Sequence, residues 1–233
     1  MKDYKISKID STLAANIIKE HHYSHSWSSC KHAIGLFSQE FLVGIAVYGF
    51  PVGRQVTTSI SPLINKDNVL ELKRLWISDS EGKNTESWFL SRTFHWLRKY
   101  DPIIKVLISY SDPDHGHLGV IYQATNWLYQ GVDIRQQDAY FYYINGEQLH
   151  PRTVYSKYGS THPSDLIKID PNFKRVLMPK KHRYLYILAP KKEKRRILRT
   201  LKHPILSYPK SNKCEVRKMN GLVINQRGDE FFE

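Results

Sequence analysis

The sequence predicts an α/β fold built on one mixed β-sheet. Apolar runs of strand length alternate along the chain with stretches of helical periodicity. Two segments have the pattern of β-hairpins, which add antiparallel strands to such a sheet. The chain has 233 residues, 41% of them hydrophobic and 24% charged, which excludes a disordered chain and provides a core that needs no disulfides.

Residues 11–100 predict a helix, a hairpin, a strand and a second helix, in that order. Residues 11–22 place their apolar side chains on one stripe of a short helix. Residues 33–50 form two apolar runs around a polar turn, which is typical of a hairpin. A strand at residues 69–78 is followed by a helix at residues 87–100, whose large apolar residues recur at nearly helical spacing.

The middle of the chain predicts a central strand, a helix and a second hairpin. Residues 103–112 are largely apolar, as a strand buried on both faces would be. Residues 119–131 are predicted to be one helix that Gly131 closes as its C-cap. Asn145 and Gly146 stand between two strand-like runs, which is the strongest short signal for a hairpin.

The excess positive charge is concentrated at the C-terminal end. Residues 1–173 contain 18 Lys and Arg against 17 Asp and Glu, whereas residues 174–233 contain 17 against 5. We therefore expect a neutral catalytic domain at 1–173 and a basic part at 174–233 that completes the sheet with a strand at 183–190 and contacts nucleic acid.

The densest basic segment, residues 190–204, has the pattern of a helix with one apolar face. Its cations suit contacts with phosphates, and the alternative is a solvated helix surface. An anionic membrane surface is the weaker choice because the segment has few aromatic anchors. The residues expected to contact DNA here are Lys191, Lys192, Lys194, Arg195, Arg196 and Arg199.

Several classes of protein are excluded by what the sequence lacks. No apolar run reaches the length of a bilayer span, and the N-terminus has no apolar segment of a secretion signal, so we expect a cytosolic protein without a membrane partner. Cys30 and Cys214 are the two cysteines, and their distance in sequence excludes a disulfide framework and an all-cysteine zinc site. The sequence leaves the oligomeric state open.

A set of longer motifs gives a specific resemblance. They are HHYSHS (21–26), ELKRLWIS (71–78), SYSDPDHGHLGVIYQATNWLYQG (109–131), YYINGEQLHPRTV (142–154) and KHRYLYIL (181–188) with YPK (208–210). These motifs are similar to those of the Mom family of phage DNA-modification proteins, which have the acyltransferase fold of the GNAT superfamily. The resemblance implies a GNAT-like fold with a basic C-terminal extension.

The resemblance also implies an activity. Mom-like enzymes convert adenine in double-stranded DNA to its N6-methylcarbamoyl (carbamoylmethyl) form and so protect phage DNA from host restriction, in the cytoplasm of the infected bacterium. The group donor would be acyl-CoA or another small activated molecule, and an iron ion is a further candidate cofactor.

Two other functions stay open. A conventional GNAT N-acyltransferase would use acyl-CoA on a small or protein amine, but the turn at residues 79–87 has a single glycine, Gly82, where that superfamily has a glycine-rich pyrophosphate loop. The third possibility is a DNA-binding protein without catalysis, for which substitution of His22, Tyr23 or Asp112 would leave the cellular phenotype intact.

The first candidate site residues follow the first helix and lie on the strand at 69–78. The resemblance favours His22 and Tyr23, which could act as a base, hold a metal or stack on an extruded adenine. Together with Asp112 they are the possible iron ligands. Glu71 could deprotonate the acceptor amine, or it could instead form an ion pair with Lys73 or Arg74. Arg74 could hold a phosphate or the donor carboxylate.

The long motif contains the remaining site candidates. Ser109 and Asp112 end the central strand, where α/β sheets bind ligands, although Asp112 before a proline could be only a turn residue. In the following loop, the match to the family favours His117. Tyr122 is a candidate acid for the departing thiolate, and Asn126 would share its helix face as a donor contact.

Further residues are predicted to face DNA outside the basic segment. Trp27 could be a stacking platform, and basic residues around the second hairpin and the last strand could contact phosphates. These basic residues are Arg152, Lys180, Lys181 and Arg183.

Overall fold

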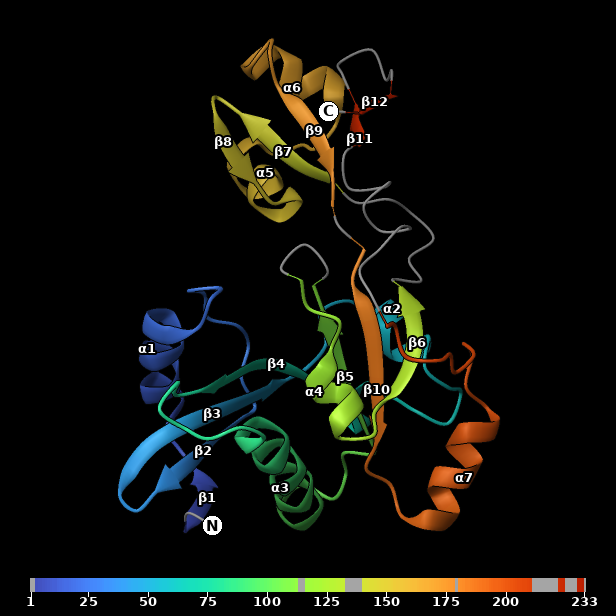
Figure 1. Ribbon diagram of the computed structural model, residues 1–233. Coiled ribbons are helices and arrows are strands. Elements are labelled where there is room, and N and C mark those ends of the chain that lie inside the picture. Colours follow the sequence, from blue (N-terminus) through green and yellow to red (C-terminus); the bar gives the residue numbers. More distant parts are fainter. Residues whose placement is uncertain are drawn as a thin grey trace. The chain divides into compact units, whose positions relative to one another are not determined.

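The structure is a computed structural model that describes residues 3–112, 116–132, 140–178, 180–210, 222–224 and 230–232. The chain folds into two compact units (Figure 1). The first unit comprises residues 1–110, 119–131 and 183–208, and the second comprises residues 111–118, 132–182 and 209–233. The second unit is inserted between strands that are neighbours in the sheet of the first.

The first unit is built on a seven-stranded sheet with strand order β1-β2-β3-β4-β5-β10-β6. Neighbours from β1 to β4 are antiparallel, whereas β4 and β5 are parallel. The strands are β1 (Tyr4–Lys8), β2 (His32–Ser38), β3 (Phe41–Gly49), β4 (Val69–Ile77), β5 (Val106–Ser111), β6 (Leu128–Val132) and β10 (His182–Ile187). The predicted mixed α/β fold is confirmed.

Helices cover both faces of this sheet because alternate residues of each strand point to opposite sides. Figure 1 shows α1 and α3 on opposite sides of β3. Ile18 of α1 packs with Ile45 of β3, whereas Phe89 of α3 packs with the adjacent Ala46, and Ile197 of α7 packs with Val106 of β5. The helices of this unit are α1 (Ser11–His21), α2 (Arg54–Thr58), the 3-10 turn η1 (Lys66–Asn68), α3 (Thr85–Tyr100), α4 (Val120–Ala124) and α7 (Lys191–Arg199).

Strand β4 separates from β5 at the middle of the sheet but stays paired with β3. Its pairing with β5 ends at Glu71 and Ile108, so the two parallel strands separate beyond that point. On the other side, Val47 opposes Arg74 and Tyr48 opposes Leu72. Lys73 therefore lies in a β-bulge, a feature that bends a strand and redirects its side chains.

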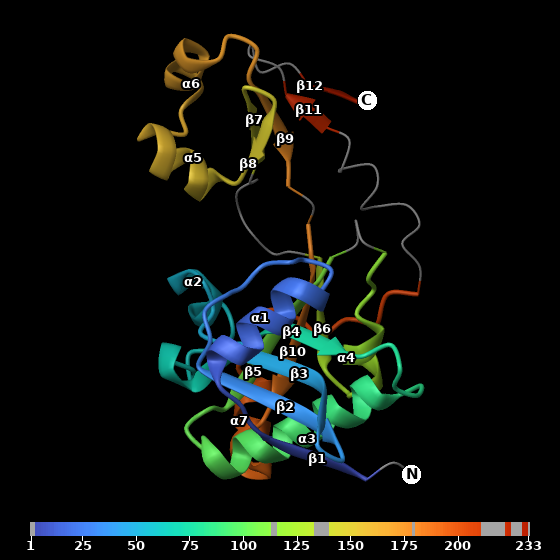
Figure 2. The same cartoon turned by 90° about the vertical axis from the view of Figure 1, so that its left-hand side faces the viewer.

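The second unit is a five-stranded sheet with order β12-β11-β9-β7-β8 and two helices. Figure 2 shows α5 and α6 together on one side of this sheet. Val154 of α5 and Leu166 of α6 pack there on Tyr142 and Ile144 of β7. The elements are β7 (Tyr140–Ile144), β8 (Glu147–Leu149), α5 (Pro151–Tyr158), α6 (Pro163–Ile169), β9 (Lys174–Leu177), β11 (Leu222–Ile224) and β12 (Glu230–Phe232).

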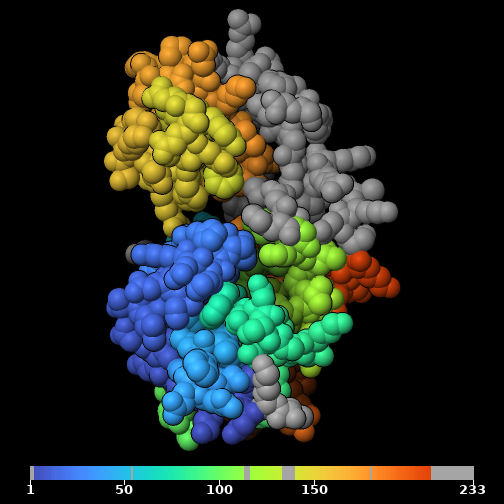
Figure 3. All heavy atoms as spheres, turned by 60° about the vertical axis from the view of Figure 1, so that its left-hand side comes forward, coloured from blue at the N-terminus to red at the C-terminus, as the bar shows by residue number. Residues whose placement is uncertain are grey.

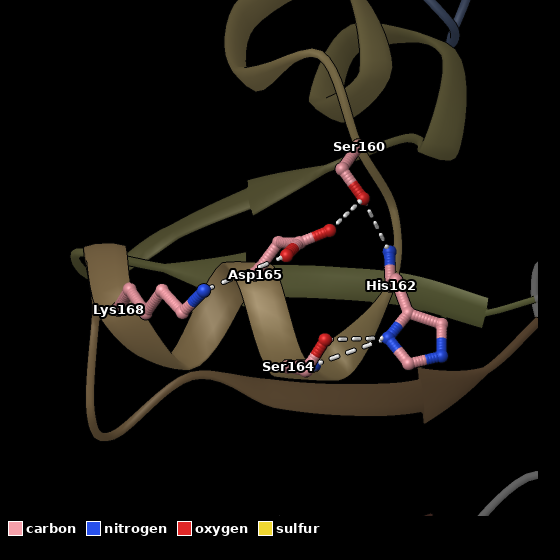
Figure 4. A network of polar contacts seen from close by, with 5 residues as sticks. All are labelled: Ser160, His162, Ser164, Asp165 and Lys168. Atoms are coloured by element: carbon pink, nitrogen blue, oxygen red, sulfur yellow. Dashed lines mark hydrogen bonds and ion pairs between the residues drawn. The ribbon is translucent and has the colours of Figure 1, made fainter.

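Both helices of the second unit begin at a His-Pro pair, and in each the histidine is the N-cap. Nδ1 of His150 accepts a hydrogen bond from the backbone N–H of Arg152 at 3.1 Å. Nδ1 of His162 accepts from the N–H of Ser164 at 3.4 Å, and Asp165 accepts from the hydroxyl of Ser160 at 2.7 Å (Figure 4). The two bonds to histidine Nδ1 satisfy helix N–H groups that have no partner inside the helix.

Two expectations from the sequence differ from this fold. Residues 119–131 form α4 and β6 rather than one helix, because Thr125 ends α4 and Asn126 takes a left-handed conformation with φ of 60°. The units also divide the chain differently from an expected boundary after residue 173, since the second unit combines residues 111–118, 132–182 and 209–233. The expected boundary came from the distribution of charged residues, which lie mostly on the surface. That distribution does not show that residues 132–182 are inserted between the strands β6 and β10.

Candidate functional site

The candidate site of the first unit lies where β4 and β5 separate. Tyr23 follows α1, Glu71 and Arg74 belong to β4, Ser109 belongs to β5, and Tyr122 belongs to α4. Tyr23 and Glu71 both act electrostatically on Arg74 and on Tyr122, which places the four side chains in one neighbourhood. Figure 3 shows the N-terminal segment in blue meeting the teal and green segments around α3 and α4 on one face of this unit.

Ser109 connects the two separating strands to Tyr122. Its Oγ lies 3.1 Å from the carbonyl oxygen of Leu72 on β4 and 2.8 Å from the hydroxyl of Tyr122. The rings of Trp127 and Tyr184 lie about Tyr122, with centroids at 5.1 and 5.0 Å. Burial raises the pKa of Tyr122 to about 12, and the negative charge of Glu71 acts in the same direction.

Glu71 is held by a cation from its own strand. Nζ of Lys73 lies 2.6 Å from Oε2 of Glu71, and the Lys73 side chain is 4% exposed. This contact places both side chains on the same face of β4. Of the two cations that the sequence offered Glu71, the structure thus shows a pair with Lys73. The candidate base Glu71 therefore forms an ion pair with the buried ammonium group of Lys73.

Arg74 is fixed by three hydrogen bonds. Its Nε and one terminal nitrogen donate to the carbonyl oxygen and Oγ of Ser26 at 3.0 and 2.8 Å, and the other terminal nitrogen donates to the carbonyl oxygen of Lys73 at 2.7 Å. Burial lowers the pKa of Arg74, while Tyr23 and Glu71 oppose that effect. A guanidinium has five N–H donors in a rigid plane, so this anchoring orients the group for binding an anion.

His22 and Tyr23 are adjacent but differ in exposure. His22 is buried and its ring lies 4.3 Å from that of Tyr23, which is 57% exposed. Nδ1 of His22 accepts from the backbone N–H of Ser24 at 3.1 Å. A neutral His22 therefore carries its proton on Nε2, and that tautomer does not offer the Nε2 lone pair to a metal.

The iron site suggested by the sequence gains no support. Asp112 belongs to the second unit, where its Oδ2 lies 2.9 Å from Nζ of Lys181, while His22 and Tyr23 belong to the first. Across the part of the chain that the structure describes, no group of three or more His, Cys, Asp or Glu side chains could hold a metal ion. The hydrogen bonding of His22 argues in the same direction.

Three other candidates belong to the second unit or lie beyond the end of α4. Asp112 and His117 belong to the second unit, and the backbone N–H of His117 donates to the carbonyl oxygen of Asp112 at 3.1 Å. Asn126 is exposed and lies beyond the end of α4. It therefore does not share a helix face with Tyr122, and its prediction as a donor contact loses its geometric basis.

Gly119 was not among the residues that the sequence singled out. Gly119 has φ of +72°, and a Cβ atom there would lie 2.6 Å from the Tyr184 ring and 2.9 Å from the Tyr122 ring. Gly119 therefore permits the ring packing that holds Tyr122.

The residues predicted to contact DNA have different exposures. The six predicted cations of α7 are all exposed, as is Arg152 on α5, whereas Lys180 and Trp27 are half-buried. Lys181 is exposed and pairs with Asp112. Arg183 is 2% exposed, so its prediction as a DNA contact was wrong. Arg183 lies on the central strand β10, whose residues are almost all buried. A count of basic residues along the sequence does not distinguish a buried strand from an exposed helix.

Comparison with known proteins gives the family. The model of the Mom protein family matches residues 3–210. The chain belongs to the Mom family. A relative, the methylcarbamoylase mom of Escherichia phage Mu, is 29% identical over 217 residues, which cover 90% of this chain and 85% of that protein. The family and the transferase class predicted from the sequence are confirmed.

Solved structures with similar folds are acetyltransferases. An N-acetyltransferase from Staphylococcus aureus Mu50 is 10% identical with a TM-score of 0.43, and the match covers 80% of this chain and 98% of that one. The ribosomal-protein-S18-alanine N-acetyltransferase from Escherichia coli is also 10% identical, with a TM-score of 0.45 and coverage of 81% and 96%. A GNAT family acetyltransferase from Elizabethkingia anophelis with acetyl-CoA bound is 9% identical, with a TM-score of 0.41 and coverage of 80% and 99%.

None of the helices within the described residues is long and apolar enough to cross a membrane.

Proposed function

We propose that this protein transfers a methylcarbamoyl (carbamoylmethyl) group to N6 of adenine in double-stranded DNA. Membership of the Mom family and the relative named a methylcarbamoylase support this activity. The observation that carries the proposal is the cluster of Tyr23, Glu71, Arg74 and Tyr122 where β4 and β5 separate. It combines an exposed aromatic ring, a carboxylate, an oriented cation and a partly buried phenol.

The exposed ring of Tyr23 is suited to contact the adenine. N6 of adenine is engaged in base pairing within a duplex, so an enzyme must take the base out of the stack to reach it. Extruded bases are held by stacking on aromatic side chains, and Tyr23 presents such a ring next to Arg74. Arg74 would hold an anionic group of the donor, which we propose to be acyl-CoA or another small activated molecule.

The transfer requires two proton movements. A bond forms between N6 and the carbon of the transferred group, and the bond from that carbon to the leaving group breaks. The N6 proton goes to a base, for which Glu71 is the candidate, and the leaving group takes a proton from an acid, for which Tyr122 is the candidate. The electrostatic effect of Glu71 on Tyr122 supports giving these two roles to them.

The exposed cations of α7 would bind phosphates at some distance from the reacting base. The carbonyl oxygen of Lys105, just before β5, accepts from the N–H groups of Leu188 and Ala189, and Lys105 pairs with Glu193 of α7 at 3.4 Å. Ser109 lies four residues further along β5, which is about 13 Å at the rise of a strand. That length corresponds to about four base-pair steps, so α7 would anchor the flanking duplex.

In the cell, this activity would protect phage DNA from host restriction in the cytoplasm of the infected bacterium. Restriction enzymes read base edges in the grooves, and a substituent on N6 of adenine changes the edge presented in the major groove. The relative from phage Mu supports a phage setting.

Nucleoside mass spectrometry of plasmid DNA tests the proposal. Bacteria would express the native protein, Tyr23→Ala, Tyr122→Phe or a control, Tyr100→Ala, whose tyrosine is 58% exposed against 57% for Tyr23. We expect a deoxyadenosine species heavier by one carbamoylmethyl group with the native protein and the control, and its absence in the other two. Unmodified DNA from well-expressed native protein would contradict the proposal and make acyl-CoA binding, as in a conventional N-acyltransferase, the next test.

A further inference from the structure

Where β4 and β5 separate, the carbonyl oxygen of Leu72 lies beyond the last residue pair of the two strands. The last paired residues are Glu71 and Ile108, and the carbonyl oxygen of Leu72 comes directly after them. Oγ of the buried Ser109 lies 3.1 Å from this oxygen. A buried carbonyl without a donor is costly, so the Ser109 hydroxyl has a structural reason to donate to Leu72.

The same hydroxyl faces Tyr122 at 2.8 Å. A serine hydroxyl has one proton and two lone pairs, whereas a carbonyl oxygen can only accept. While Ser109 donates to Leu72, a neutral Tyr122 must therefore donate its own proton to Ser109. In that arrangement the Tyr122 oxygen has lone pairs and no proton to offer the space between the strands.

The alternative arrangement reverses the polarity of the pair. Rotation of the Ser109 hydroxyl directs its proton to the Tyr122 oxygen, and the Tyr122 proton is then free to point at a bound molecule. A tyrosinate left after proton transfer needs this second arrangement, because only a donor can satisfy the negative oxygen. Hydrogen bonding from Ser109 lowers the pKa of Tyr122 against the larger effect of burial.

We propose that Ser109 is a positioning residue that directs the Tyr122 proton, switching its own donation from the Leu72 carbonyl to the Tyr122 oxygen when Tyr122 gives up its proton. This inference rests on the proposed function only in that it makes Tyr122 the acid of the transfer. The charged and titratable groups that act on Tyr122 come from four other elements or their ends: Tyr23, Tyr48, Glu71 and Tyr184.

The first measurement needs no donor and no DNA. The purified protein would be labelled with fluorotyrosine, and the ¹⁹F signal of residue 122 would be assigned by its absence in Tyr122→Phe. We expect Ser109→Ala to move the titration of this signal to higher pH and to leave the other tyrosine signals in place. Ser109→Thr, which keeps the hydroxyl, should restore the native titration. An unchanged Tyr122 titration in a folded Ser109→Ala protein would overturn the proposal.

The second measurement follows the rate of DNA modification after induction. A hydrogen bond to an ionised group corresponds to roughly 10- to 100-fold in rate, so Ser109→Ala should slow the reaction by that factor and Ser109→Thr should restore it. If Ser109→Ala does not fold, Ser109→Cys keeps the size and supplies only a weak donor, and an intermediate rate and titration are expected. Native-like behaviour of Ser109→Cys in both measurements would contradict the switch.

The two measurements separate the proposals. Absence of modification by the native protein, together with a Ser109-dependent titration of Tyr122, would reject the proposed DNA reaction and keep the hydroxyl pair. Modification that depends on Tyr122 but not on Ser109 would do the reverse.

Discussion

Gly119 allows the structural argument to be tested through a single methyl group. A Cβ atom at this position would lie 2.6 and 2.7 Å from two ring atoms of Tyr184 and 2.9 Å from a ring atom of Tyr122. Tyr184 is fully buried and cannot move aside into solvent. The substitution Gly119→Ala therefore combines an unfavourable backbone with a clash against two aromatic rings.

The cost can be estimated from these two parts. A non-glycine residue at a φ of +72° costs roughly 1–2 kcal/mol. Overpacking a filled core costs about 1–3 kcal/mol more. We expect Gly119→Ala to lower the free energy of unfolding by roughly 2–5 kcal/mol in urea denaturation, and to abolish DNA modification because the Tyr122 ring is displaced.

Gly116 provides the matched control. Its φ is +73°, and no atom of the described residues lies within 4 Å of a Cβ built there. Gly116→Ala therefore carries only the backbone cost, about 1–2 kcal/mol. Equal losses of stability in the two variants would refute the packing of Tyr122 and Tyr184 around Gly119.

Three further predictions concern other parts of the molecule. Burial, and then the charge of Arg152, lower the pKa of His150, whose Nδ1 caps α5. The stability that this cap contributes is present above the ordinary pKa of 6.5 and is lost as the pH falls through the lowered pKa, so the backbone amides of α5 should exchange faster at acidic pH. His150→Asn, which supplies a cap that does not titrate, should remove that pH dependence. Replacing the six exposed cations of α7 by Gln should weaken DNA binding. It should also reduce the slope of the logarithm of the DNA-binding constant against the logarithm of the salt concentration by about 0.9 for each phosphate that is no longer neutralised. Lys66→Gln on η1 should leave this slope unchanged, and an unchanged slope in the α7 variant would argue against binding of DNA by α7. Thr93 Oγ1 lies 2.6 Å from the buried Tyr48 hydroxyl and also donates to a helix carbonyl. Thr93→Val leaves the Tyr48 hydroxyl without this partner and should lower the free energy of unfolding in urea by about 1–3 kcal/mol, whereas Tyr48→Phe should lower it by about 0.5–1.5 kcal/mol. The reverse order of the two losses would contradict this network.

The sequence predicted most elements of the fold because their patterns are local. The apolar runs at residues 33–50 and 69–78 and the Asn145-Gly146 turn correspond to observed strands and a hairpin. The prediction of one helix at residues 119–131 was wrong because aromatic residues at helical spacing also fit a turn followed by a strand. There the left-handed Asn126 and the tertiary packing of Trp127 decide the conformation, and neither is visible in a periodicity.

For the site, the sequence indicated residue types and the strand ends, but not how the side chains pair. The ion pair of Glu71 involves Lys73, which lies in a β-bulge of β4. The bulge arises from the register of β4 against β3, which the sequence of β4 alone does not show. The exposure of each basic residue likewise depends on which face of an element it occupies. Arg183 and the cations of α7 look alike in sequence, yet the former is buried and the latter are exposed.

The insertion of the second unit also bears on synthesis of the chain. β10 lies between β5 and β6 in the sheet, but it is translated last of the three, about 50 residues after the end of β6. At a ribosomal rate of about 5–20 residues per second, the interval lasts roughly 3–10 s. During that time the apolar strand β5 has an unpaired edge in the nascent chain, and an unpaired edge of this kind can associate with other nascent chains.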